Sequence, residues 1–252
     1  MKKNTDSVIV YWAPWWDKNL NLDLDIMYHK PIPVYQDLLK SFNPPTITKN
    51  FMNCPAVKDH LESTFLVLNP SDTDMQVSFN EQNEVDGLIN NNTVNTPVPG
   101  ALKHSPTLTS QLLIEYGMSF SFFCEEPLEL FISSPYFHQA PYLNYGAIVP
   151  GGFDIGKWYR PFNCEINLWE GNGRLIIKKD EPLAYFKFAT DKKIILKRYN
   201  VNEKLYRLSV ALVNFKDTSR WTNLMHRYER FSRSEMREIV LKEIKNNLIE
   251  GL

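Results

Sequence analysis

Five short apolar runs follow one another between residues 145 and 199, and this succession leaves little room for a fold not built from strands. The runs read YGAIVP, CEINLWE, RLIIKK, LAYFKFAT and KIILKRY. Each is rich in β-branched or aromatic residues and is bounded by turn-forming residues, which is the pattern of successive β-strands. The segment EGNG at 170–173 predicts a tight hairpin, because Gly171 and Gly173 adopt positive φ without steric cost. The sequence therefore predicts a mainly β fold.

The first half of the chain holds further predicted strands. Three apolar runs there have strand character, namely VIVYW at 8–12, TFLVLNP at 64–70 and DMQVSFN at 74–80. Two longer runs, 112–126 and 128–137, predict an antiparallel pair with a turn at Glu125–Pro127. Residues 80–100 have the composition of a turn and predict an exposed loop.

Near the C-terminus the apolar spacing becomes that of a helix. Apolar side chains recur every four residues, at Met236, Val240, Ile244 and Leu248. Ser232 and Glu235 have the spacing of a capping box for this helix. Asp217 or Thr218 is the expected N-cap of the helix that precedes it. The C-terminal segment is therefore predicted to form two α-helices.

These predictions combine into one architecture. We expect a mainly β domain over residues 1–216, a β-sandwich or a β-clip-like roll, with the exposed loop near 80–100. The helical segment over 217–252 is expected to pack on it, because its apolar face needs a partner. Two shorter helices are predicted at 34–39 and 55–61.

Charge and apolar run length exclude two classes of partner. The formal net charge is −1 and the sequence pI is about 6.5. Bulk binding of duplex nucleic acid needs a strong basic field, so we do not expect it. No apolar run reaches the roughly 18 residues that a membrane helix requires, so we expect no membrane partner.

The cysteines exclude redox chemistry of the thioredoxin kind. The segment WAPWW at 12–16 resembles the stretch before the redox cysteines of thioredoxins, but Trp16 stands where the first cysteine would be. The three cysteines, Cys54, Cys124 and Cys164, form no C-x-x-C pair. Their scatter predicts no disulfide framework and a reducing compartment, the cytoplasm.

The sequence also lacks the common catalytic fingerprints. No G-x-S-x-G, P-loop or G-x-G-x-x-G motif occurs. The five histidines form no H-x-H, H-x-D or H-E-x-x-H pattern, so no metal site is predicted.

Most of the chain resembles a family of uncharacterised proteins encoded by phages and bacteria. The similar segments are FMNCPAVKDHLESTFLVLNPSDTDM, GGFDIGKWYRPFN and KKDEPLAYFKFATDKKIILKRY. The resemblance implies a bacteriophage origin, with the protein in the host cytoplasm or in the virion. It implies no mechanism.

A shorter stretch resembles the dUTP pyrophosphatases and dCTP deaminases, which have a β-clip fold. The similarity covers GGFD at 151–154, then Tyr159 and Arg160, then a strand, a hairpin and EPLAYF at 181–186. It implies that Asp154 activates the attacking water, that Tyr159 stacks under the deoxyribose and that Mg²⁺ is the cofactor. Tyr159 follows Asp154 by five residues, whereas three is the spacing in that family.

Because no segment gathers convergent catalytic groups, the leading hypothesis is a phage-encoded accessory protein that acts as a non-catalytic binding or structural module. Its predicted binding residues are Phe153, Lys157, Trp158 and Arg160, since Trp and Arg are enriched at interface hot spots. A protein partner or self-association is expected, with no cofactor. The alternatives are a nucleotide phosphohydrolase using Asp154 and a metal-dependent oxygenase. The same residues also fit a structural corner in which Trp158 covers the core.

Overall fold

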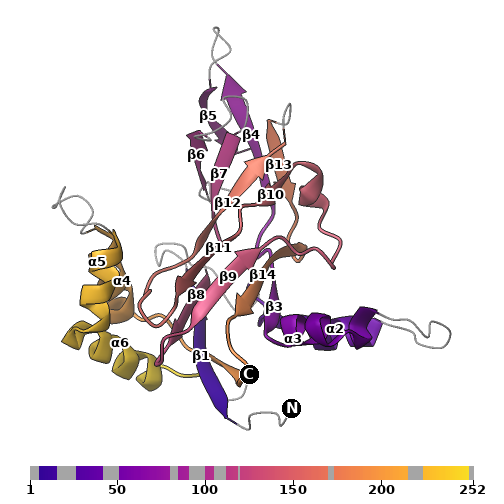
Figure 1. Cartoon of the computed structure of the whole chain (residues 1–252). Helices are drawn as coiled ribbons and strands as arrows, with labels where there is room; N and C mark the ends of the chain where they lie inside the picture. The colour runs from indigo at the N-terminus through magenta and orange to yellow at the C-terminus, as the bar shows by residue number, and fades with distance from the viewer. Residues whose placement is uncertain are drawn as a thin grey trace.

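The computed structural model describes residues 6–15, 27–41, 51–79, 85–90, 100–104, 112–118, 120–169, 173–214 and 224–249. Within these residues the strands form four sheets, and helices flank them (Figure 1). The prediction of a mainly β fold with C-terminal helices is confirmed. No helix in this part of the chain is both long and apolar enough to cross a bilayer.

The central strand of one three-stranded sheet is buried on both faces. β1 (Ser7–Pro14) lies between β15 (Lys193–Arg198), to which it is parallel, and β8 (Phe120–Cys124), to which it is antiparallel. Alternate side chains point to opposite faces of a strand. Val8, Val10 and Trp12 therefore enter the main core, while Tyr11 and Ala13 pack under the C-terminal helices. The continuous apolar run at 8–13 follows from this double burial.

The largest sheet carries helices on part of its outer face. Its strand order is β11 (Gly151–Asp154), β9 (Glu129–Ser133), β14 (Pro182–Phe188), β3 (Thr64–Leu68) and β2 (Ile32–Pro33). Phe186 and Phe188 of β14 point into the main core, whereas Tyr185 points to the outer face. There it packs under two short helices, α2 (Val34–Ser41) and α3 (Pro55–Glu62). The 3₁₀ turn η1 (Phe51–Asn53) directly precedes α3.

Two further sheets extend the β region away from the helices (Figure 1). One has the order β10 (Gly146–Ile148), β12 (Asn163–Leu168), β7 (Leu112–Gly117) and β6 (Gly100–His104). The other has the order β13 (Arg174–Ile177), β4 (Thr73–Phe79) and β5 (Val85–Asn90). A second 3₁₀ turn, η2 (Pro141–Asn144), precedes β10. The loop expected near 80–100 thus contains strand β5 and the first residue of β6, and its other residues lie outside the described part of the chain.

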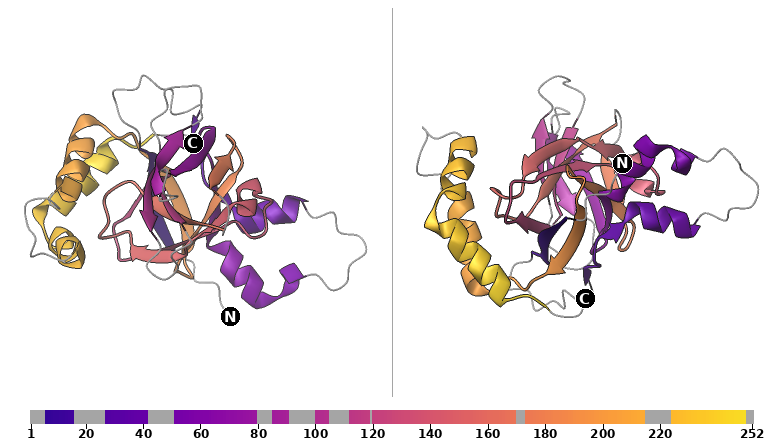
Figure 2. Two further views of the ribbon diagram at one scale, coloured as in Figure 1. Left: turned by 90° about the horizontal axis from the view of Figure 1, so that it is seen from above. Right: turned by 60° about the horizontal axis from the view of Figure 1, so that its bottom comes forward.

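Three helices follow β15 in the described residues, where two were predicted: α4 (Glu203–Asn214), α5 (Leu224–Ser232) and α6 (Glu235–Asn246). They lie on one side of the β region, and α2 and α3 lie on the opposite side (Figures 1 and 2). The helical segment begins at Glu203 because the Asn202 side chain accepts a hydrogen bond from the Leu205 amide, which caps α4. The caps predicted at Asp217 and Thr218 lie outside the described residues.

Several local pairings differ from the predictions. The run 112–126 divides into β7 and β8, which belong to different sheets, and β8 pairs with β1 rather than with β9. β12 and β13 also belong to different sheets, so the segment 170–173 does not join a paired hairpin. The N-cap of α6 is Ser234, not Ser232, because the Ser232 hydroxyl donates to the Glu229 carbonyl inside α5. For the strands, a partner distant in the sequence replaces the neighbouring strand. For α6, the preceding helix extends through the predicted cap residue.

Candidate functional site

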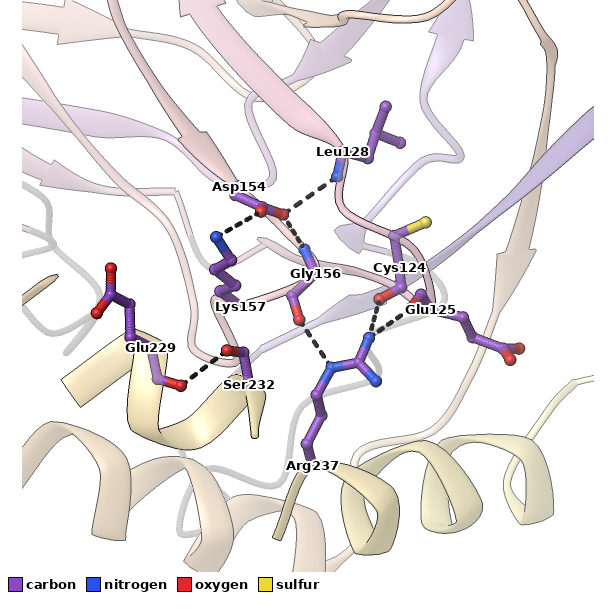
Figure 3. A network of polar contacts seen from close by, with 9 residues as sticks. All are labelled: Cys124, Glu125, Leu128, Asp154, Gly156, Lys157, Glu229, Ser232 and Arg237. Atoms are coloured by element: carbon purple, nitrogen blue, oxygen red, sulfur yellow. Dashed lines mark hydrogen bonds and ion pairs between the residues drawn. The ribbon is translucent and has the colours of Figure 1, made fainter. Parts of the chain in front are cut away.

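Asp154 fixes the turn in which the predicted site residues lie. Its Oδ1 accepts hydrogen bonds from the backbone amides of Leu128 (3.1 Å) and Gly156 (2.8 Å). Its Oδ2 lies 3.4 Å from the Lys157 ammonium (Figure 3). The carboxylate therefore connects β11 to the chain entering β9, and most of its acceptor capacity is used within the protein.

Tyr159 lies in a different environment from Asp154. Its side chain is fully buried, with its ring edge-on to Trp15 at 5.8 Å and to Phe123 at 5.4 Å. Burial raises the pKa of the Tyr159 phenol well above its usual value. The structure thus places Asp154 in a surface turn and Tyr159 in the core beneath the C-terminal helices. The roles implied for them in a phosphohydrolase stay a prediction that this arrangement does not support.

The aromatic residues of the same turn pack against α5. Trp158 stacks on Phe153 at 4.9 Å and on Tyr228 of α5 at 4.4 Å. The Arg160 guanidinium lies over the Trp158 ring at 4.6 Å, a cation–π arrangement. The aromatic and arginine residues that predicted an interaction surface therefore contact one another and α5 within the chain. Binding of an external partner by these residues stays a prediction.

Arg237 of α6 secures this turn from the other side. Its Nε donates to the Gly156 carbonyl (3.1 Å), and its terminal nitrogen donates to the carbonyls of Cys124 and Glu125 (Figure 3). One guanidinium thus satisfies three backbone acceptors from two separate turns, which suits its planar set of donors. The contacts of Arg237 drawn in Figure 3 therefore connect the sheet region to the C-terminal helices.

A second polar cluster lies where α2 meets the largest sheet. His138 stands between a carboxylate and a phenol, with its Nε2 3.2 Å from Asp37 Oδ2 and its Nδ1 2.5 Å from the Tyr185 hydroxyl. The Phe137 amide also donates to that hydroxyl oxygen. Because a carboxylate only accepts, Nε2 carries a proton and donates to Asp37, while Nδ1 forms the hydrogen bond with the Tyr185 hydroxyl. This chain of bonds ties α2 to β14.

A second histidine forms a similar arrangement beside the first. Lys187 Nζ lies 3.0 Å from His60 Nδ1, and His60 Nε2 lies 2.6 Å from the Tyr136 hydroxyl. An ammonium only donates, so Nδ1 accepts and the proton of the neutral ring is on Nε2. Burial lowers the pKa of His60, and the neighbouring Lys187 charge lowers it further, which favours this neutral form. His60 therefore donates to the Tyr136 oxygen, and the hydroxyl proton of Tyr136 points away from the histidine.

Exposed aromatic rings lie next to the two partners of this histidine, Tyr136 and Lys187. The Tyr136 ring contacts the rings of Tyr185 (4.9 Å) and Phe137 (4.8 Å). Phe131 lies directly opposite Lys187 across the β9–β14 pair, and its ring covers Gly152, where a Cβ would lie 2.5 Å from the ring. Phe131, Tyr136 and Phe137 are 43 %, 49 % and 39 % exposed. We call these three rings, together with His60 and Lys187, the aromatic patch.

Sequence reasoning missed the aromatic patch. Its members come from α3, from β9 and the loop after it, and from β14, and the sheet register brings them together. The available signal was the run SSPYFH at 133–138, which places two aromatic residues and a histidine directly after a strand. Cys54, the cysteine nearest to a helix start, is exposed at the N-cap of α3.

No group of three or more His, Cys, Asp or Glu side chains is arranged to hold a metal ion in the described parts of the chain. Comparisons with protein-family models, with curated proteins and with solved structures found no match.

Proposed function

We propose that the protein is a non-catalytic binding module that engages a protein partner through the aromatic patch. The observation that carries the proposal is the exposure of Phe131, Tyr136 and Phe137 on the largest sheet and the loop beside it. Tyrosine is enriched at interface hot spots, and clustered exposed apolar side chains mark interaction sites. With the resemblance described above, the module would be a phage-encoded accessory protein.

The protonation states of the cluster favour binding over chemistry. Burial raises the pKa values of Tyr136 and Tyr185, so both phenols stay protonated near neutral pH. A protonated phenol is a hydrogen-bond donor and a poor nucleophile. The cluster therefore supplies fixed donors and apolar rings, which are the components of a recognition surface.

Site-specific photo-crosslinking tests this proposal. A benzophenone amino acid replaces Phe131 or Phe137, and the matched control replaces Trp169, which is equally exposed at 43 % but follows β12 in a different sheet. We expect one discrete protein adduct from both patch positions in the cells that naturally make the protein. The proposal fails if no adduct forms, or if Trp169 yields the same one.

A thermal unfolding panel tests the alternative of an enzyme. The protein is heated with each deoxynucleotide and Mg²⁺, and we expect the melting temperature to remain unchanged. A ligand at 100 times its Kd adds about 2.7 kcal/mol to stability, which raises the melting temperature by several degrees. Such a rise with one deoxynucleotide would replace the binding module with the phosphohydrolase.

A further inference from the structure

The aromatic patch presents hydrogen-bond donors beside apolar surface. Lys187 uses one of its three ammonium protons on His60. Among the described residues no carboxylate pairs with Lys187, although eight other lysine or arginine side chains form ion pairs with acidic residues elsewhere: Lys58, Lys157, Arg174, Lys192, Lys204, Arg207, Arg237 and Lys245. The neutral His60 ring thus positions the Lys187 ammonium but does not neutralise its positive charge.

Tyr136 supplies the second donor. Its oxygen already accepts the Nε2 proton of His60, so the O–H group is turned to the opposite side. Tyr136 is 49 % exposed, so it is accessible to a ligand. Two hydrogen-bond donors therefore flank the His60 ring. The charged donor is the Lys187 ammonium, and the neutral donor is the Tyr136 hydroxyl.

The apolar part of the patch is fixed next to the charge. Phe131 and Lys187 are directly opposite on neighbouring strands, where side chains lie about 5 Å apart at Cβ. The contact with Gly152 supports the Phe131 ring from below, because no side chain there lifts it from the sheet. A ligand that places an apolar group on this ring brings its neighbouring atoms to Lys187.

We infer that the aromatic patch binds a peptide segment that carries a carboxylate next to an apolar side chain. The carboxylate accepts from Lys187, a backbone carbonyl of the segment accepts from Tyr136, and the apolar side chain packs on Phe131 and Phe137. Charge complementarity selects this occupant, since a basic segment would meet an uncompensated ammonium. The inference rests on the proposed function and names the chemistry of its partner.

Small probes test the recognition without the partner. The labelled protein is titrated by NMR with phenylacetate, which carries a ring and a carboxylate, and with benzylammonium, which carries the same ring and the opposite charge. We expect phenylacetate to shift the His60 and Phe131 ring signals in a saturable manner and benzylammonium to leave them in place. Equal responses to the two probes would overturn the inference.

Two variants and a control assign the effect to the patch. Lys187→Gln should weaken phenylacetate binding by about threefold or more and remove the preference for it over benzylammonium. Tyr136→Phe should weaken binding while the ring contacts remain. Lys193→Gln, at an exposed lysine of β15 in another sheet, should change nothing. A preference retained in a folded Lys187→Gln protein would contradict the inference.

The outcomes separate this inference from the proposed function. Crosslinks from Phe131 and Phe137 without a preference for phenylacetate would leave the binding module intact and reject the acidic segment. A preference for phenylacetate without any crosslinked protein would reject the protein partner and leave a site for small carboxylates. That result would overturn the inference as stated, because it requires a peptide.

Discussion

Asp154 has a role that two substitutions can distinguish. Replacement by Ala leaves the Leu128 and Gly156 amides without their acceptor, so we expect a loss of about 1–3 kcal/mol of unfolding free energy. Replacement by Asn keeps an acceptor oxygen and removes only the ion pair with half-exposed Lys157, so we expect a loss of less than about 1 kcal/mol. Urea denaturation measures both values, with Lys157→Gln as the control. Equal losses for Asn and Ala would show that charge, not backbone capping, is the main contribution.

His60 predicts a dependence of stability on pH. Its pKa is lowered in the folded state by burial and by Lys187, so the unfolded chain takes up the proton at a higher pH than the folded protein does. This difference leaves the protein fully stable above the ordinary histidine pKa of about 6.5 and reduces stability as the pH falls below it. Denaturation curves between about pH 7.5 and 5 should therefore show a smaller loss for His60→Gln than for the native chain. A loss of the same size in both would contradict the predicted shift.

Arg237 joins α6 to two turns of the sheet region. Arg237→Ala removes all three donors from the carbonyls of Gly156, Cys124 and Glu125, and we expect α5 and α6 to open more often. The cost is about 2 kcal/mol, because hydrogen bonds from a charged donor are lost. Hydrogen exchange should become faster over 224–249, whereas Lys242→Ala, at an exposed position of the same helix, should leave it unchanged. Unchanged exchange in Arg237→Ala would mean that the apolar contacts alone hold the helices.

Strands with a local signal were predictable, and their partners were not. The continuous apolar run at 64–70 and the alternating run at 74–80 form β3 and β4, since both patterns are properties of the segment itself. The pairing of β8 with β1 was missed because 112–126 and 128–137 are adjacent in sequence and hid a partner more than one hundred residues away. Helix α4 was missed because its cap, Asn202, lies shortly after a strong strand that ends at Arg198.

The same limit applies to the candidate sites. The turn at 153–160 was found because its charged and aromatic residues are neighbours in the sequence. The two histidine clusters were not found, because their members are distant in the sequence. Asp37 contacts His138, and Lys187 contacts His60, only when the sheet is formed. Burial also decided the outcome at Tyr159, whose position in the core no spacing rule anticipates.

The molecule as a whole should unfold in one step. β1 contributes Val10 and Trp12 to the main core and Tyr11 to the cluster under the C-terminal helices, so neither cluster can be lost while the other keeps this strand in place. We expect the far-UV circular dichroism and the tryptophan fluorescence to change at the same urea concentration. Val240→Ala in α6 should shift both transitions together, because Val240 is fully buried against this cluster.

Two separated transitions would contradict this prediction. An early change in helical signal with the tryptophan signal retained would mean that α4, α5 and α6 form an independent unit. The coupling through β1 would then be weaker than the shared burial implies.

The pairing of Ser7 with Lys193 also orders events during synthesis. β1 leaves the ribosome early, β8 becomes available to one of its edges later, and β15 completes the other edge only after nearly all remaining strands have been translated. Until then an apolar strand presents unpaired backbone groups, which other chains can capture. Closing so distant a contact is slow, since the loop entropy must be overcome before the pairing contributes. We therefore expect a cell that makes this protein quickly to accumulate nascent chains in which β1 is still unpaired, and holdase chaperones to raise its yield of folded protein.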